Sequence, residues 1–122
     1  MEQDLTEIFT VDRNDCISDI SVDLPDLLGT YILVKWMEIV SAKLAIDTID
    51  ENYITVGKSI DIQHMGMAKK GDKVSIRSKL IKKEKKKLTF SIVAKLNNTQ
   101  IAEAKHTRII ISKKIVERQF KK

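Results

Sequence analysis

Cysteine, proline and aromatic residues are scarce in this chain of 122 residues. A single cysteine excludes an internal disulfide, which is typical of a protein from a reducing compartment. Because only 5% of the residues are aromatic, the core has to consist mainly of Ile, Val, Leu and Met. No stretch approaches the roughly 20 apolar residues that cross a bilayer, and the acidic first residues lead into no apolar run of a signal peptide. We therefore expect a cytoplasmic protein without a membrane partner.

The length of the chain predicts one domain over residues 1–122. A chain of this size can bury a core, but association with a second copy would add stability. With 22 Lys and Arg against 17 Asp and Glu, the formal net charge is +5, which favours anionic partners such as nucleic acids, anionic lipids and phosphorylated cofactors. The lysines are not gathered into one arm and have few aromatic residues between them, unlike the surfaces that bind single-stranded nucleic acids. We expect no nucleic-acid partner.

The apolar pattern predicts one long helix followed by four long strands. Residues 30–46 contain no glycine or proline and are rich in Leu, Met, Ala, Lys and Glu, which favours a helix. Apolar and polar residues then alternate, as in an antiparallel sheet with one wet face. Including a short first strand, the predicted strands cover residues 6–11, 54–64, 74–80, 88–96 and 102–110, and Lys58 breaks the second one. This order predicts an α+β fold in which an antiparallel sheet wraps around one central helix.

The predicted helix has two faces that avoid water. At about 100° per residue, the broad apolar face consists of Ile32, Leu33, Trp36, Met37, Val40 and Leu44. A second face of small or polar residues has Glu38 in its middle, so we expect this carboxylate to be partly buried. Pattern alone leaves two roles open for Glu38, a surface ion pair with Lys35 or Lys43 and a functional site. Thr30, at the helix start, taken alone favours an N-cap.

Both histidines of the chain fall on the apolar side of a strand pattern. A polar side chain on a buried face is costly unless a partner satisfies it. His64 ends the second predicted strand, where a satisfied core or edge histidine is the simplest interpretation. His106 and Arg108 share one strand face with alanines, which leaves room either for an entering ligand or for an ion pair at a strand end or interface.

Taken in order, these residues resemble the hotdog-fold thioesterases, and among them the subgroup typified by fluoroacetyl-CoA thioesterase. The resemblance covers the chain from about residue 25 to residue 120. It rests on Gly29-Thr30 and Glu38, Thr55-Val56-Gly57, Ile62-Gln63-His64, Gly71, and Lys105-His106-Thr107-Arg108. It implies a hotdog fold, an acyl-CoA substrate, no cofactor or metal, and active sites at the interface of a homodimer that can pair further into a tetramer.

The resemblance also implies roles for single residues. It makes Thr30, Glu38 and His64 catalytic. The implied substrate-binding residues are Gly57, Arg108, Leu24, Tyr31 and His106. Leu24 stands in place of an aromatic gate and Tyr31 in place of a small residue, so a generic short- or medium-chain acyl-CoA fits better than fluoroacetyl-CoA. Candidates for the phosphates of coenzyme A are Lys69, Lys70, Lys73 and Arg108.

Thioester hydrolysis needs an activated nucleophile, a proton carrier and stabilisation of the oxyanion. On this hypothesis Glu38 acts as general base or as nucleophile, His64 relays a proton to the leaving thiolate, and Thr30 positions the water or the carboxylate. The alternative is a non-catalytic hotdog module that binds acyl-CoA or a related ligand as a sensor or partner protein. A nucleic-acid binder, supported only by the positive charge, is the weakest interpretation.

Overall fold

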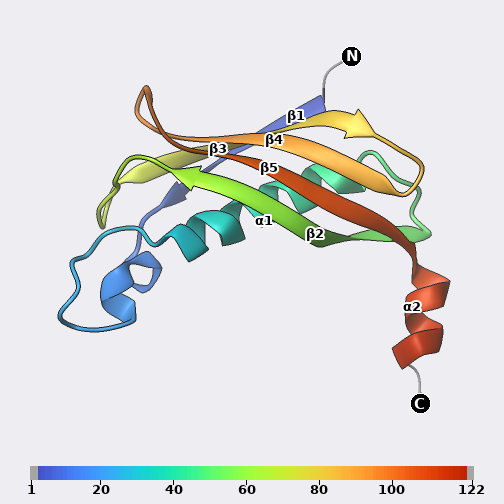
Figure 1. The fold of residues 1–122 in the computed structure, drawn as a ribbon, viewed down its shortest axis with the longest axis horizontal. Helices are drawn as coiled ribbons and strands as arrows, with labels where there is room; N and C mark the ends of the chain where they lie inside the picture. Colours follow the sequence, from blue (N-terminus) through green and yellow to red (C-terminus); the bar gives the residue numbers. More distant parts are fainter. Residues whose placement is uncertain (1–2, 121–122) are drawn as a thin grey trace.

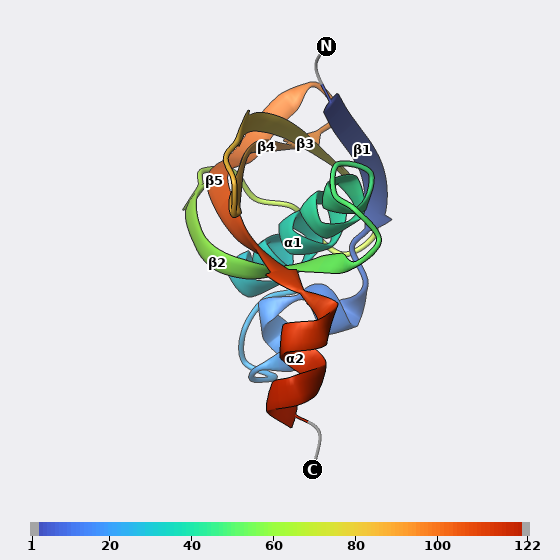
Figure 2. The same ribbon diagram turned by 90° about the vertical axis from the view of Figure 1, so that its right-hand side faces the viewer.

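A five-stranded antiparallel sheet curves around one long helix in the computed structural model, which describes residues 3–120 (Figures 1 and 2). The strands are β1 (Gln3–Thr10), β2 (Tyr53–His64), β3 (Lys73–Lys83), β4 (Lys87–Leu96) and β5 (Thr99–Ser112), in the order β1-β3-β4-β5-β2. The helix α1 (Thr30–Ile46) lies in the hollow of the sheet. The predicted α+β architecture with a central helix is therefore confirmed.

The strands run beyond several of the predicted bounds. β3 continues to Lys83 and β5 to Ser112, while β1 starts at Gln3 and ends one residue before the predicted end. The break predicted at Lys58 is confirmed as a register shift between Gly57 and Ser59 in the pairing of β2 with β5. A bulge of this kind bends the strand and changes which groups face the core.

Three short elements were not predicted. Two 3-10 turns, η1 (Arg13–Asp15) and η2 (Ile17–Asp19), precede α1, and the helix α2 (Lys113–Phe120) follows β5. The expectation that only strands follow α1 was wrong: residues 113–120 form a short helix, none of whose residues is buried. Within residues 3–120, no helix is both long and apolar enough to span a bilayer.

The predicted apolar face of α1 packs against the concave face of the sheet, and all six of its predicted members are buried. Trp36 stacks on Phe9 of β1, with ring centroids 4.8 Å apart. A buried hydrogen bond of 2.8 Å between the hydroxyls of Ser41 and Ser78 ties α1 to β3. Apolar burial and this polar contact together fix the rotation of the helix, and with it the side of α1 that Glu38 occupies.

The start of α1 is held beside the end of β2. The N–H of Gly29 donates to the carbonyl of Asp15, and the N–H of Leu28 donates to the carbonyl of Ala68, just after β2. Gly29 is the N-cap and Thr30 is the first helical residue, so the prediction of Thr30 as N-cap was wrong. The threonine hydroxyl is therefore available for a contact outside the helix.

Candidate active site

The hydroxyl of Thr30 contacts His64 across the gap between α1 and β2. Thr30 Oγ1 and His64 Nδ1 are 2.8 Å apart, which is a hydrogen-bond distance. The other ring nitrogen, Nε2, is buried and has no hydrogen-bond partner among the residues that the structure describes. Buried polar atoms nearly always have a partner. His64 is therefore an oriented imidazole with one free nitrogen.

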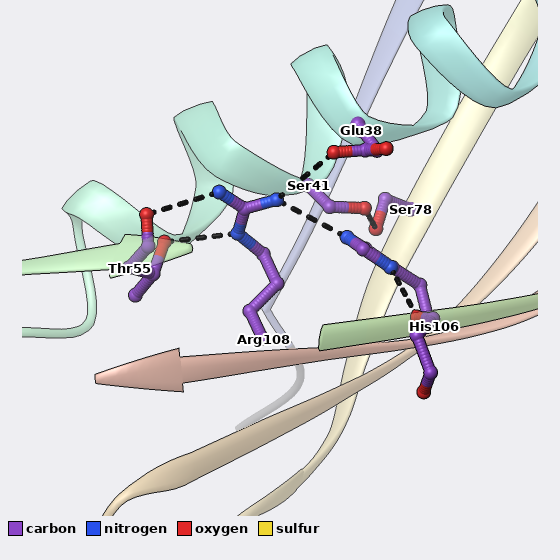
Figure 3. Close-up of polar contacts among 7 residues, drawn as sticks. Glu38, Ser41, Thr55, Ser78, His106 and Arg108 are labelled. Atoms are coloured by element: carbon purple, nitrogen blue, oxygen red, sulfur yellow. Dashed lines mark hydrogen bonds and ion pairs between the residues drawn. The ribbon is translucent and has the colours of Figure 1, made fainter. Parts of the chain in front are cut away.

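Glu38 lies two helical turns further along α1 and faces Arg108 of β5 (Figure 3). Glu38 Oε2 is 3.9 Å from Arg108 Nη1, and the two side chains are 46% and 7% exposed. Lys43, one of the two suggested surface partners of Glu38, instead forms an ion pair with Glu7 at 3.0 Å. Glu38 is thus a carboxylate that is open to solvent on one side and faces a buried cation on the other.

The guanidinium of Arg108 is held by three further hydrogen bonds (Figure 3). Nε donates to the hydroxyl of Thr55 at 2.9 Å, Nη2 donates to the carbonyl of Thr55 at 3.1 Å, and Nη1 donates to Nε2 of His106 at 3.2 Å. Burial lowers the pKa of Arg108, and the nearby Glu38 carboxylate opposes this shift. The guanidinium remains charged, because an arginine is not deprotonated in proteins.

His106 is a buried, neutral imidazole. Its Nδ1 lies 2.8 Å from the carbonyl of Ser59, just after the β2 bulge, and this carbonyl can only accept. Nδ1 therefore carries the proton, which leaves Nε2 to accept from Arg108. Burial lowers the pKa of His106; the Arg108 charge lowers it further, while the Ser59 carbonyl and Glu38 raise it. His106 acts as a rigid support for Arg108.

Gly57 lies against this cluster from the edge strand β2. A Cβ at Gly57 would be 3.0 Å from Glu38 Oε2, 3.5 Å from His106 Cε1 and 3.6 Å from Arg108 Nη1. The first of these distances is tighter than most real Cβ contacts, so a side chain would displace the carboxylate. Only glycine leaves Glu38 its present position.

The predicted site residues form two groups within the chain. Thr30 joins His64, whereas Glu38 joins Gly57, His106 and Arg108. Thr30 and Glu38 are eight positions apart, which corresponds to about 12 Å along the helix axis. No hydrogen bond or ion pair joins the two groups among residues 3–120.

Two of the predicted substrate-binding residues lie in or near the loop before α1. The hydroxyl of Tyr31 donates to the carbonyl of Cys16 at 3.4 Å, and its ring covers Gly29. Leu24 is 39% exposed and borders a hollow of about 460 Å³ together with Pro25 and Lys70. Among residues 3–120, neither side chain forms a hydrogen bond with the Thr30–His64 pair.

Thr55 and the carbonyl of Ser59 shape the site, although the sequence predicted no separate role for either. The side chain and carbonyl of Thr55 hold Arg108, and the carbonyl of Ser59 holds His106. The break in alternation at Lys58 was the one available signal, because it showed that β2 is irregular at this point. In the part of the chain that the structure describes, no group of three or more His, Cys, Asp or Glu side chains is arranged to hold a metal ion.

Comparisons with known proteins place this arrangement in context. The family described as fluoroacetyl-CoA-specific thioesterase matches residues 11–114. No curated protein matches the sequence.

Three solved structures illustrate the similarity of the fold. A fluoroacetyl-CoA thioesterase is 17% identical, with a TM-score of 0.86 over 98% of this chain and 93% of the other. A thioesterase superfamily member from Thermus thermophilus is 20% identical, with a TM-score of 0.87 over 98% and 88%. A hot-dog-like protein from Thermanaerovibrio acidaminovorans is 17% identical, with a TM-score of 0.87 over 95% and 86%. These likenesses confirm the hotdog fold.

Proposed function

The chain belongs to the family of fluoroacetyl-CoA-specific thioesterases and is an acyl-CoA thioesterase, and we propose that it hydrolyses a short- or medium-chain acyl-CoA at a site between two subunits. The observation that carries the proposal is the pair formed by Thr30 and His64, in which an oriented imidazole keeps one nitrogen free. On the same helix, Glu38 presents a half-exposed carboxylate. These groups supply the base, the proton carrier and the orienting hydroxyl that thioester hydrolysis requires.

The proposed reaction begins with attack on the thioester carbonyl. Glu38 either removes a proton from the attacking water or attacks the carbonyl itself. The first N–H groups of α1, beside Thr30, have no partner within the helix and lie where they can stabilise the developing oxyanion. The C–S bond then breaks, and His64 delivers a proton to the leaving thiolate while Thr30 holds the ring through Nδ1.

A single turnover in ¹⁸O-labelled water distinguishes the two roles of Glu38. If Glu38 acts as general base, the oxygen that the acid product gains comes from solvent and carries the label. If Glu38 is the nucleophile, a mixed anhydride forms as the thiolate leaves. Attack of labelled water on the glutamyl carbonyl of this anhydride then releases an acid that carries no label, and the label enters the Glu38 carboxylate.

We propose that two copies associate through β2, which is an edge of the sheet. Its exposed apolar residues, Tyr53 at 45% and Val56 at 41%, and the unpaired backbone groups of an edge strand favour pairing with another strand. Antiparallel pairing would bring the His64 end of one β2 toward the Tyr53 end of the other. A site built from both subunits explains why Thr30 and Glu38 are separated within one chain.

Val56→Glu tests this dimer, because it places a charge on the pairing edge. We expect the dimer mass measured by light scattering to fall to that of the monomer and hydrolysis to fall with it. Ser91→Glu, which places the same charge at an exposed position of the inner strand β4, is the control and should leave the dimer mass unchanged. A monomeric Val56→Glu protein with full activity would exclude a site between subunits.

The proposed acyl specificity is based on residues of this chain and on the ligands found in similar enzymes. Variants of the fluoroacetyl-CoA thioesterase have been solved with fluoroacetate and CoA and with acetyl-CoA. Here the loop before α1 presents Leu24 in place of an aromatic gate, and Tyr31 is tied to Cys16. We therefore propose broader acyl-CoA use than fluoroacetyl-CoA alone. The single, buried Cys16 fits a proposed cytoplasmic location.

The deciding experiment measures release of the coenzyme A thiol from a panel of acyl-CoAs by the wild-type protein and by Glu38→Gln. We expect the wild type to hydrolyse some members and the variant to be slower by about 10²- to 10⁴-fold. Glu7→Gln, which removes a surface carboxylate of the Lys43 pair, is the matched control and should keep full activity. Tight binding of an acyl-CoA without turnover by the wild type would favour the sensor instead.

A further inference from the structure

Two neighbouring cavities lie between the region of Thr55 and the β3–β4 hairpin. Their volumes are about 420 Å³ and 560 Å³, and Ile49, Asp50 and Tyr53 line both. The first cavity begins at Thr55, the residue that holds Arg108. The second, which we name the lysine groove, is lined by Thr48, Ile49, Asp50, Tyr53, Lys83, Lys85, Lys86, Ile110, Ile111, Ser112 and Ile115.

Four segments far apart in the sequence meet at the lysine groove. The turn between α1 and β2, the β3–β4 hairpin, the end of β5 and the start of α2 lie at one end of the sheet (Figure 1). The Nζ of Lys83 donates to the carbonyl of Thr48, which joins the hairpin to the turn. Because this hydrogen bond and the backbone bond from Ile110 to the carbonyl of Lys86 hold the walls together, the groove is built into the fold.

The chemistry of the lysine groove is that of a receptor for an amphipathic anion. Isoleucines and the ring of Tyr53 form an apolar floor, and the ammonium groups of Lys83, Lys85 and Lys86 form one rim. Asp50 lines both cavities and accepts the N–H of Asn52 at 2.8 Å, and the inner cavity adds Glu51 and Lys113. The lysine groove thus has three lysines against one carboxylate and the inner cavity one lysine against two, so phosphate groups are favoured at the lysine end.

We propose that the lysine groove binds the nucleotide end of coenzyme A, with the phosphates on Lys85 and Lys86 and the adenine on the floor beside Tyr53. This inference rests on the proposed hydrolysis of acyl-CoA. From Arg108 to Ser112 the path along β5 is roughly 13 Å, a distance that an extended pantetheine arm covers. The lysine-rich hairpin thereby gains a ligand.

Ile115, half-exposed on α2, completes one wall of the groove. This placement differs from that suggested by sequence, in which Lys69, Lys70, Lys73 and Arg108 are the candidates for the phosphates.

Lys85→Gln/Lys86→Gln tests the proposal and leaves the structural contact of Lys83 in place. We expect KM for acyl-CoA to rise about 5- to 30-fold, as for the loss of two exposed charge contacts, with kcat unchanged. The same acyl group on pantetheine, which has no nucleotide, should show no change in KM. Lys95→Gln/Lys105→Gln removes the same charge from exposed positions on β4 and β5 and should behave as wild type.

Three results would overturn the proposal. They are an unchanged KM in Lys85→Gln/Lys86→Gln, an equal rise for acyl-pantetheine, and an equal rise in Lys95→Gln/Lys105→Gln. A rise caused instead by Lys69→Gln/Lys70→Gln/Lys73→Gln would move the phosphates to the other end of the sheet.

Calorimetry with coenzyme A separates this proposal from the proposed function, because it requires no hydrolysis. If the wild type binds coenzyme A and the lysine variant binds it 5- to 30-fold more weakly, the groove is supported even when no acyl-CoA is cleaved. If both proteins bind coenzyme A equally, the groove is excluded even when hydrolysis is efficient. Melting temperatures of all variants check that each one folds.

Discussion

The two polar groups along α1 differ in how fully their atoms are bonded. The Thr30–His64 pair lies at the helix start, where the threonine is exposed and one imidazole nitrogen has no partner among the described residues. The Arg108–His106 pair lies under the middle of the helix, where both imidazole nitrogens and all three guanidinium nitrogens make contacts.

From this difference we expect the first group to take part in proton transfer and the second to hold the fold in place. A free nitrogen can exchange a proton with a ligand, whereas a fully bonded, buried cluster is rigid and costly to disturb. Glu38 lies in the second group, where it faces Arg108, but its half-exposed carboxylate is also open to a ligand. Substitutions in the first group should therefore reduce activity and spare stability, and those in the second should reduce stability.

The largest effect is expected for His64→Gln. Turnover should fall by about 10²- to 10⁴-fold, because the proton carrier is lost, while the melting temperature stays near that of the wild type. The measurement is thiol release together with thermal unfolding. Gln63→Ala, an exposed neighbour on β2, is the control. Normal turnover in His64→Gln would remove this residue from the mechanism.

Arg108→Lys should lower the free energy of unfolding by about 1–3 kcal/mol. Lysine keeps the charge but cannot bond Thr55 twice and His106 at the same time, so buried partners lose their hydrogen bonds. Urea unfolding measures the loss. Arg77→Lys, whose ion pair with Asp4 is exposed, should change stability by less than about 0.5 kcal/mol. Equal losses of unfolding free energy in Arg108→Lys and Arg77→Lys would show that the buried cluster stabilises the fold no more than a surface ion pair does.

A smaller effect is expected from pH. Because burial lowers the pKa of His106 in the folded protein, the unfolded chain binds a proton more readily as the pH falls below the ordinary histidine value of about 6.5. This contribution to stability is complete above that pH and decreases below it. The slope of stability between pH 7.5 and 5 should be smaller in His106→Gln than in wild type. Identical slopes in the two proteins would show that His106 does not titrate with unfolding.

Much of the architecture was predictable because it depends on neighbouring residues. The spacing of apolar residues in α1 and the alternation in the strands are local patterns, and the break in alternation at Lys58 falls where the pairing of β2 with β5 shifts register. The errors also have local causes. Thr30 is a good N-cap by type, but Gly29 occupies that position, and α2 is only eight residues long, too short to show a repeated helical period.

The sequence by itself determined the central helix, the strands, the break in the second strand and the residue types available for acid–base chemistry. Only the tertiary structure decided which of these residues meet. The Arg108–Thr55 contact joins residues 53 positions apart, and the Thr30–His64 contact joins residues 34 positions apart. Such contacts follow from strand pairing and from the rotation of α1 against the sheet. Periodicity reports the face on which a side chain lies, but the partner across that face is set by register and packing, which are properties of the whole chain.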